Sequence, residues 1–402
     1  MKAIMYGAGN IGRGFIGSLF SQSGYEVIFI DVDDAVVTQL NRDRAYPVRV
    51  VCGADSRESV VAPVCAIHGS DVDQVAEAIA GADIMATAVG VRVLPRIAEA
   101  IARGVALRHA RGAKPLNIII CENLIGADTA MREWIRPHLP EPAAAAFDRF
   151  VGLIEAAIGR MVPVQTEAMR AGNPLRVCVE PYDFLPVDRD GFRGEIPEIH
   201  NMVPFSPFDF YIRRKLFIHN CGHAMCAYLG MYMGLEYIHE AIHVPEIRIL
   251  CQSAMTESAT ALSKRYQVDI CELLNHVSDL LVRFHNSALM DTCARVGADI
   301  PRKLSANDRL IGAAALCVEF DIPPTYIAAG CAAALYAHLR EEGLAQSEAN
   351  ARNALIALSG LADEDLMRDI LALYQMLAEG KPLDALIEQC DVLYGAACGA
   401  VV

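Results

Sequence analysis

The sequence is short of positive charge and contains no long apolar stretch. Its 35 lysines and arginines face 49 aspartates and glutamates, which gives a formal charge of −14 at neutral pH. Nucleic acids and anionic membranes are bound through basic fields, so this balance excludes both as main partners. No apolar run reaches the roughly 18 residues needed to cross a bilayer, and no cleavable signal precedes the first glycines. We therefore expect a cytoplasmic protein without nucleic-acid or membrane partners.

The sequence also lacks the cysteine spacings of disulfide frameworks and zinc sites. Thirteen cysteines are present, but they are scattered among apolar neighbours without repeated C-x-x-C pairs, which indicates reduced, buried thiols. The nearest approach to a metal cluster is Cys221, His223 and Cys226. On a helix Cys221 points roughly 120° or more away from the other two, so no metal is expected.

Strand-like and helix-like segments alternate in the first half of the chain, which has room for two domains at 402 residues. This alternation predicts a parallel sheet in an α/β fold, a Rossmann-type doubly wound domain over residues 1–195. Residues 150–185 keep strand character and are expected to extend the sheet, with 175–180 the clearest segment. Proline, glycine and aspartate concentrate at 186–207, which suggests an interdomain passage, and residues 196–402 then read as a mostly α-helical substrate domain. The expected strands are 2–6, 25–31, 83–88 and 116–121, and the expected helices are 11–23, 72–80, 93–103, 211–229, 245–266, 271–284 and 325–339.

A G-x-G-x-x-G turn lies between the first predicted strand and helix. A dinucleotide pyrophosphate needs a backbone without Cβ atoms and the N–H groups of a helix N-terminus, which such a turn supplies. Asp31 ends the next strand about 20 residues further on, where an acid accepts bonds from the ribose hydroxyls and repels a 2′-phosphate, so NAD is favoured over NADP. The alternative for Asp31 is a solvated acid at a strand end. The predicted cofactor contacts in the turn are Gly7, Ala8, Gly9, Asn10, Ile11 and Gly12.

Further candidates follow the later strands. Thr87 and Val89 end one of them, at the edge where open α/β sheets bind ligands, and are predicted to border the cofactor; simple packing is the alternative for Val89. Asn123 follows another strand and can donate an amide hydrogen bond to a reacting oxygen, or form an Asx turn at a helix start.

Lys215, Asn220 and His223 form a K-x-x-x-x-N-x-x-H pattern in a predicted helix. Asn220 lies roughly 140° and His223 roughly 80° around an α-helix from Lys215, so the three share one side. A lysine base, an amide donor and an imidazole can manage the proton of a carbinol during hydride transfer. Neighbouring positive charge, here Arg213 and Arg214, lowers a lysine's pKa as a base requires. The alternative is a solvated lysine beside a buried histidine.

These motifs together resemble the polyol-specific long-chain dehydrogenases, and most closely their mannitol-1-phosphate 5-dehydrogenase branch. The resemblance covers nearly the whole chain. It implies a metal-independent NAD enzyme with Lys215 as general acid/base, Asn123 and Asn220 as the oxyanion pair, His223 as a substrate partner, and a site in the cleft between the two domains. The resemblance rests on residues 7–17, 87–90, 116–123, 214–217 with Asn220, Gly222 and His223, and 302–305 with 308–310.

The family also places an arginine and a lysine eight residues apart in the substrate pocket, a spacing matched by Arg295 and Lys303. Together with Arg302 they are predicted to clamp a phosphate; a solvated cluster at a helix end is the alternative. The chain departs from the branch at Gly159, Arg213, His219 and residues 286–288, which changes pocket charge and shape.

The sequence therefore predicts an NAD-dependent oxidoreductase that interconverts mannitol 1-phosphate and fructose 6-phosphate. One alternative keeps the chemistry but acts on an unphosphorylated polyol or a sugar acid. An alternative of another class is a catalytically inactive NAD-binding regulatory protein.

Overall fold

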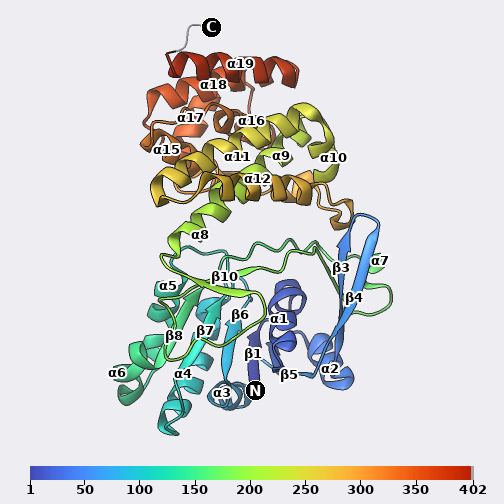
Figure 1. Ribbon diagram of the computed structural model, residues 1–402, viewed down its shortest axis with the longest axis vertical. Coiled ribbons are helices and arrows are strands. Elements are labelled where there is room, and N and C mark those ends of the chain that lie inside the picture. Colours follow the sequence, from blue (N-terminus) through green and yellow to red (C-terminus); the bar gives the residue numbers. More distant parts are fainter. Residues whose placement is uncertain (400–402) are drawn as a thin grey trace. The chain divides into compact units, whose positions relative to one another are not determined.

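The computed structural model describes residues 1–399, and it divides the chain into two compact units, Met1–Ile212 and a second that begins at Arg213 (Figure 1). The division lies further along the chain than the 195/196 boundary expected from the sequence. The reason is a pair of parallel strands, β10 (Leu185–Asp188) and β11 (Met202–Phe205), which holds the Pro- and Gly-rich passage within the first unit. No helix among the described residues is long and apolar enough to cross a membrane.

The first unit is built on a six-stranded parallel sheet in the order β5-β2-β1-β6-β7-β8. This order reverses direction between β1 and β6, the topological switch point at which open α/β sheets bind nucleotides. The predicted Rossmann-type fold is thus confirmed. The strands are β1 (Lys2–Tyr6), β2 (Glu26–Asp31), β5 (Val64–His68), β6 (Ile84–Thr87), β7 (Leu116–Ile120) and β8 (Val151–Glu155).

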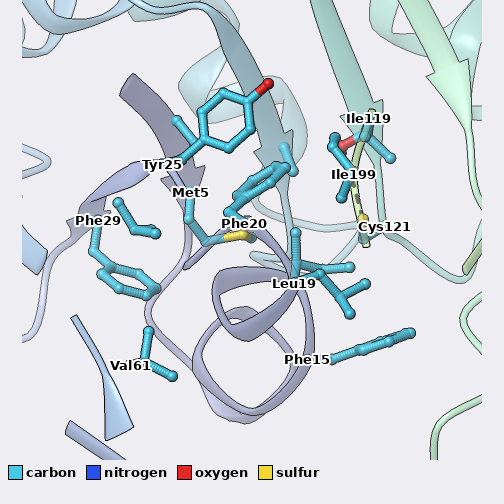
Figure 2. Close-up of a cluster of buried hydrophobic side chains, with 14 of the residues drawn as sticks. Met5, Phe15, Leu19, Phe20, Tyr25, Phe29, Val61, Ile119, Cys121 and Ile199 are labelled. Atoms are coloured by element: carbon cyan, nitrogen blue, oxygen red, sulfur yellow. Dashed lines mark hydrogen bonds between the residues drawn. The ribbon is translucent and has the colours of Figure 1, made fainter. Parts of the chain in front are cut away.

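Both faces of this sheet are buried, which explains why its strands are apolar throughout. Along β1, Ala3 and Met5 belong to one core cluster and Ile4 and Tyr6 to the other, since successive side chains point to opposite faces. Figure 2 shows the first cluster, where Met5 and Phe29 from the sheet lie with Phe20 of α1. The helices of this unit are η1 (Gly12–Ile16, a π-helix), α1 (Gly17–Gln22), α2 (Asp34–Asp43), α3 (Val72–Ala80), α4 (Leu94–Ala110), α5 (Ala127–Ile135), η2 (Arg136–His138, 3₁₀), α6 (Glu141–Phe150) and α7 (Glu167–Arg170).

A second, three-stranded sheet was not expected from the sequence. It contains the hairpin β3 (Tyr46–Cys52) and β4 (Asp55–Val61), with β9 (Val177–Val179) parallel to β3. The prediction that 150–185 extends the main sheet is right for β8 and wrong for 175–180. β9 lies instead against η1, where Val177 and Val179 pack on Gly14 at distances that admit no side chain.

The second unit is helical over its described residues, as predicted, and its one β contact there is an isolated bridge between Tyr237 and Thr292. Its central helices α9, α11 and α16 pack on one another. A methyl group at Gly222 of α9 would lie 2.3 Å from Met255 Sδ of α11, so this glycine permits the close approach. After α8 (Asp209–Arg214) the helices are η3 (Lys215–Asn220, a π-helix), α9 (Cys221–Tyr232), α10 (Ile238–His243), α11 (Pro245–Tyr266), α12 (Ile270–Phe284), η4 (Ser287–Leu289, 3₁₀), α13 (Cys293–Gly297), α14 (Ile300–Lys303), α15 (Ile311–Glu319), α16 (Thr325–Glu341), α17 (Glu348–Ser359), α18 (Glu364–Ala378) and α19 (Leu383–Ala397).

Candidate active site

The three glycines of the turn after β1 have different surroundings. Gly7 has a φ of 101°, and a methyl group there would lie 2.3 Å from the carbonyl oxygen of Ala88. At Gly12 a methyl group would lie 2.0 Å from the carbonyl oxygen of Gly7. Gly9 is exposed, and a methyl group there would meet nothing within 4 Å. Gly7 and Gly12 thus serve the protein's own packing, whereas Gly9 leaves a backbone surface open to a ligand.

Asp31, at the end of β2, is tied to this turn. Its Oδ2 accepts the N–H of Ala8 at 2.6 Å, while Oδ1 accepts the N–H groups of Val32 at 2.8 Å and Asp33 at 3.1 Å. A carboxylate has about four lone-pair positions, so both oxygens can accept further hydrogen bonds from hydroxyl groups. Asp31 is therefore part of the turn's architecture, unlike a solvated acid at a strand end.

Two buried arginines brace the turn, and neither was predicted from the sequence. The guanidinium of Arg13 folds back and donates to the carbonyl oxygen of Ala8. Arg160 donates from Nη1 to the carbonyl oxygen of Gly14 at 3.2 Å and lies over the Phe15 ring, with 5.4 Å from Cζ to the ring centre. Burial lowers the pKa of both guanidinium groups, that of Arg160 to about 10. Such buried cations require the carbonyl partners they have, which fixes the path of the turn.

The loop after β6 lies at the same edge of the sheet. Thr87 is fully buried, and its Oγ1 has no hydrogen-bond partner among the described residues. The N–H groups of Val89 and Gly90 donate to the carboxylate of Glu122 at 2.7 and 3.0 Å. Burial raises the pKa of Glu122 despite these two bonds. Glu122, which sequence reasoning passed over, links this loop to exposed Asn123, so Thr87, Val89 and Asn123 share one edge as predicted.

In the second unit, Lys215 and Asn220 are the first and last residues of the π-helix η3, and His223 follows in α9. The α-helical geometry assumed from the sequence is therefore wrong at this point. In a π-helix the hydrogen bonds run from residue i to i+5, so the turn is wider. Residues five apart then lie more nearly one above the other than the roughly 140° separation of an α-helix. The π-turn aligns Lys215 with Asn220, and π-turns occur frequently at functional sites.

The His223 ring is held from two sides. It stacks on Phe284 of α12 with 4.9 Å between ring centres and 13° between planes, and its Nε2 lies 3.4 Å from Oδ2 of Asp291. Burial alone would raise the pKa of Asp291, but His223 and Arg295 outweigh burial and lower it. His219, which was expected on the catalytic face, is buried. Desolvation, together with the positive groups around it, holds its pKa far below the usual value, so it is neutral.

Two of the three predicted clamp residues are engaged by carboxylates. Arg295 of α13 donates from Nε to Oδ1 of Asp291 at 2.8 Å, and its side chain keeps 47% of its surface exposed. Arg302 of α14 donates from Nε to Asp299 at 2.5 Å and from Nη1 to Asp308 at 3.0 Å. Arg302 keeps 43% of its side-chain surface exposed, nearly as much as Arg295, but it is held between two acids instead of one.

Lys303 is buried and donates to the carbonyl oxygens of Val296 and Ala298. Desolvation, aided by two neighbouring arginines, lowers its pKa to about 8. Its Nζ also lies 5.9 Å from the ring centre of Tyr228, which stands roughly 140° around α9 from His223. In the structure each of the three predicted cations therefore has protein partners of its own.

The sequence matches two family models over most of its length. Residues 1–201 match the family model for the mannitol dehydrogenase Rossmann domain, and residues 208–389 match that for the mannitol dehydrogenase C-terminal domain. The chain belongs to the mannitol dehydrogenase family. This assignment confirms the predicted family and the expectation of a dehydrogenase.

Curated members of the family are similar over most of the chain. A mannitol-1-phosphate 5-dehydrogenase of Brevibacillus brevis is 42% identical over 83% of this chain and 86% of its own length. That of Bacillus licheniformis is 38% identical over 93% of this chain and 96% of its own.

Two solved structures share the fold at low identity. A substrate-free D-sorbitol dehydrogenase has a TM-score of 0.76 at 15% identity, covering 96% of this chain and 95% of that chain. A Pseudomonas fluorescens mannitol 2-dehydrogenase in a ternary complex with NAD and D-mannitol has a TM-score of 0.73 at 13% identity, covering 98% and 94%.

In this member of the mannitol dehydrogenase family, the residues noted in the sequence as departures have the following surroundings. A methyl group at Gly159 would lie 3.0 Å from a ring atom of Tyr182, so the tyrosine fills the space beside this glycine. Arg213 lies over the Phe217 ring, with 6.0 Å from Cζ to the ring centre. Residues Ser287–Leu289 form the short helix η4. These changes leave Lys215, Asn220 and His223 in place.

The thiols of this family member are mostly buried, as the sequence predicts. All thirteen cysteines are free, and nine are buried. Within residues 1–399 no cluster of three or more histidine, cysteine, aspartate or glutamate side chains is suited to a metal ion.

Proposed function

We propose that the chain is an NAD-dependent dehydrogenase that interconverts mannitol 1-phosphate and fructose 6-phosphate without a metal. The observation that carries the proposal is the single helix surface formed by Lys215, Asn220 and His223, in a chain whose glycine turn suits a dinucleotide. The curated relatives named mannitol-1-phosphate 5-dehydrogenase support the choice of substrate.

The residues of the first unit fit NAD. The open backbone at Gly9 admits a pyrophosphate, and the N–H groups at the start of η1 face it. Asp31 accepts hydrogen bonds from the ribose hydroxyls and repels a 2′-phosphate, which selects NAD over NADP. The backbone at Thr87 and Val89 borders the same region.

Lys215 acts as the base in polyol oxidation and takes the proton of the reacting hydroxyl; in ketose reduction it returns that proton. The amides of Asn220 and Asn123 donate hydrogen bonds to the reacting oxygen and stabilise its negative charge. Bound NAD supplies the acceptor for the hydride of the carbinol carbon. His223 binds a neighbouring substrate hydroxyl.

The substrate phosphate is held by the predicted clamp of Arg295, Arg302 and Lys303. Arg295 contributes most, because its side chain is 47% exposed and among the described residues only Asp291 holds it, whereas two acids hold Arg302 and Lys303 is buried. Guanidinium groups bind phosphate oxygens in pairs, which suits this partly exposed arginine.

The test is a screen of NAD reduction with mannitol 1-phosphate, sorbitol 6-phosphate, mannitol and hexonates. The proposal expects mannitol 1-phosphate to have the highest kcat/KM. A preference for mannitol or a hexonate would contradict the phosphorylated substrate and favour the alternative within the same chemistry. Binding of NADH with no turnover of any substrate would favour an inactive regulatory protein.

A matched pair of lysine variants tests the base. Lys215→Ala should bind NADH with unchanged Kd and lose about 10²–10⁴-fold in kcat. Lys381→Ala, which removes an exposed lysine from the same unit, should behave as wild type. Near-normal turnover by Lys215→Ala would refute the assignment.

A further inference from the structure

Asp291 is a buried carboxylate that contacts both His223 and Arg295, two of the residues proposed to bind substrate. Its side chain is 8% exposed, and it lies between η4 and α13. The loop around it is pinned to the segment between α9 and α10. The Asp291 carbonyl accepts the N–H of Ile238 at 2.9 Å, and the Cys293 N–H donates to the Glu236 carbonyl at 2.8 Å. This carboxylate therefore has a fixed position relative to α9.

The two oxygens of Asp291 contact different side chains. Oδ2 lies 3.4 Å from Nε2 of His223, and Oδ1 accepts from Nε and Nη2 of Arg295 at 2.8 and 2.5 Å. The His223 contact is slightly longer than a good hydrogen bond, and contacts of this kind commonly shorten when substrate binds. Phe284 covers one face of the imidazole and limits its rotation.

The surroundings of Nε2 decide which ring nitrogen of His223 carries the proton. Nε2 is buried and makes no hydrogen bond of good geometry with the other described residues, so Asp291 is the acceptor at hand. An ionised carboxylate only accepts hydrogen bonds. A bare nitrogen lone pair buried against it would be repelled and left unsatisfied, whereas an N–H is attracted. The proton of the neutral ring therefore belongs on Nε2, which leaves Nδ1 as an acceptor.

We propose that Asp291 is a positioning residue that fixes His223 in the Nε2–H tautomer and at the same time orients Arg295. His223 then accepts a hydrogen bond from a polyol hydroxyl through Nδ1, and Arg295 presents its outer edge to an anionic group on the same substrate. This inference rests on the proposed function for the roles of His223 and Arg295, but the tautomer itself is a property of the protein without substrate.

The tautomer is measured by long-range ¹H–¹⁵N NMR on protein labelled at its 11 histidines, with His223→Ala used only to assign the signal. At alkaline pH, where imidazole is neutral, wild type should show a protonated Nε2 and an unprotonated Nδ1 at His223. Asp291→Asn should shift the ring towards a mixture of both tautomers. A protonated Nδ1 in the wild type would overturn the proposal, whatever the enzyme oxidises and whether or not the variant folds.

Kinetics test the consequence for substrate. Asp291→Asn should lose about ten- to a hundredfold in kcat/KM for the polyol with an unchanged Kd for NADH. The double variant with His223→Ala should lose clearly less than the product of the two single losses, because one residue acts through the other. Glu319→Gln, which removes the carboxylate of another arginine pair in the same unit, should match wild type.

Losses of Asp291→Asn and His223→Ala that multiply fully would refute the coupling, as would wild-type kcat/KM in Asp291→Asn. If the wild type oxidises no polyol, the proposed function fails, and the NMR result still decides the tautomer on its own.

Discussion

Replacing Gly9 by alanine should separate cofactor binding from folding. The added methyl group would meet no protein atom within 4 Å, and the residue does not need a positive φ. We therefore expect the free energy of unfolding to change by less than about 0.5 kcal/mol, as at an ordinary surface position. The same methyl group stands where the pyrophosphate of NAD would approach the backbone. A tenfold or greater rise in Kd for NADH, about 1.4 kcal/mol or more, is expected.

Gly12→Ala is the matched control, because its methyl group would lie 2.0 Å from the carbonyl oxygen of Gly7. Relieving such a clash costs about 1–3 kcal/mol or more, and in a domain of this size each kcal/mol lowers Tm by about 2–4 °C. Thermal unfolding without cofactor and fluorescence titration with NADH measure the two effects. A Gly9→Ala protein that binds NADH as tightly as wild type would refute the assignment of the turn. A Gly12→Ala protein with wild-type Tm would refute the packing argument.

Four more predictions concern the second unit and the thiols. Burial raises the pKa of Glu257 to about 8, from an unfolded value of about 4.3, so the native state binds more protons between these values and stability falls as pH rises from about 5 to 8. The Glu257→Gln side chain stays neutral, so the Tm of this variant relative to wild type should increase between about pH 5 and pH 8. A Tm difference that does not change with pH would contradict the raised pKa of Glu257. Arg295→Ala should raise KM for the sugar phosphate far more than KM for NADH, and equal effects would exclude the phosphate contact. Lys303→Ala should also raise KM for the sugar phosphate. It should lower Tm as well, since two carbonyl groups lose their donor at about 1 kcal/mol or more each, and an unchanged Tm would contradict these two hydrogen bonds. A thiol reagent should react quickly with the exposed Cys52, Cys271 and Cys398 and, more slowly, with the partly exposed Cys65. The nine buried thiols should react only after denaturation. Fast reaction of more than four thiols in the native protein would contradict their burial.

The fold was predictable where burial imposes a simple pattern on the chain. The expected helices over 72–80 and 245–266 match α3 and α11 at both ends. β1, β2 and β7 are apolar because both faces of the sheet are covered, and their length identifies them as strands. By contrast, β4 is polar and exposed over Asp55–Ser59 and is held by its pairing with β3. A strand without a buried face carries no apolar signal in the sequence.

The cofactor edge was also predictable, because parallel strands bring their carboxyl ends to one edge whatever the loops do. Asp31 and Thr87 end strands of the main sheet, and Gly7–Gly12, Val89 and Asn123 follow such strands. The residues that hold this edge together were missed. Arg13, Arg160 and Glu122 act on backbone groups, and a charged side chain that binds backbone looks in the sequence like any surface charge.

The helix that carries Lys215 and Asn220 shows the limit of periodicity most clearly. A fixed angle of about 100° per residue puts Lys215 and Asn220 on roughly the same side of a helix. The π-turn aligns them more closely, and the composition of residues 215–220 does not predict that turn. Asp291 was missed for another reason. It lies far along the chain from His223 and reaches it only because β-type contacts pin its loop beside α9. The sequence therefore identifies the groups proposed to meet the substrate, whereas their alignment depends on backbone turns and a buried carboxylate that only the folded chain brings into contact with them.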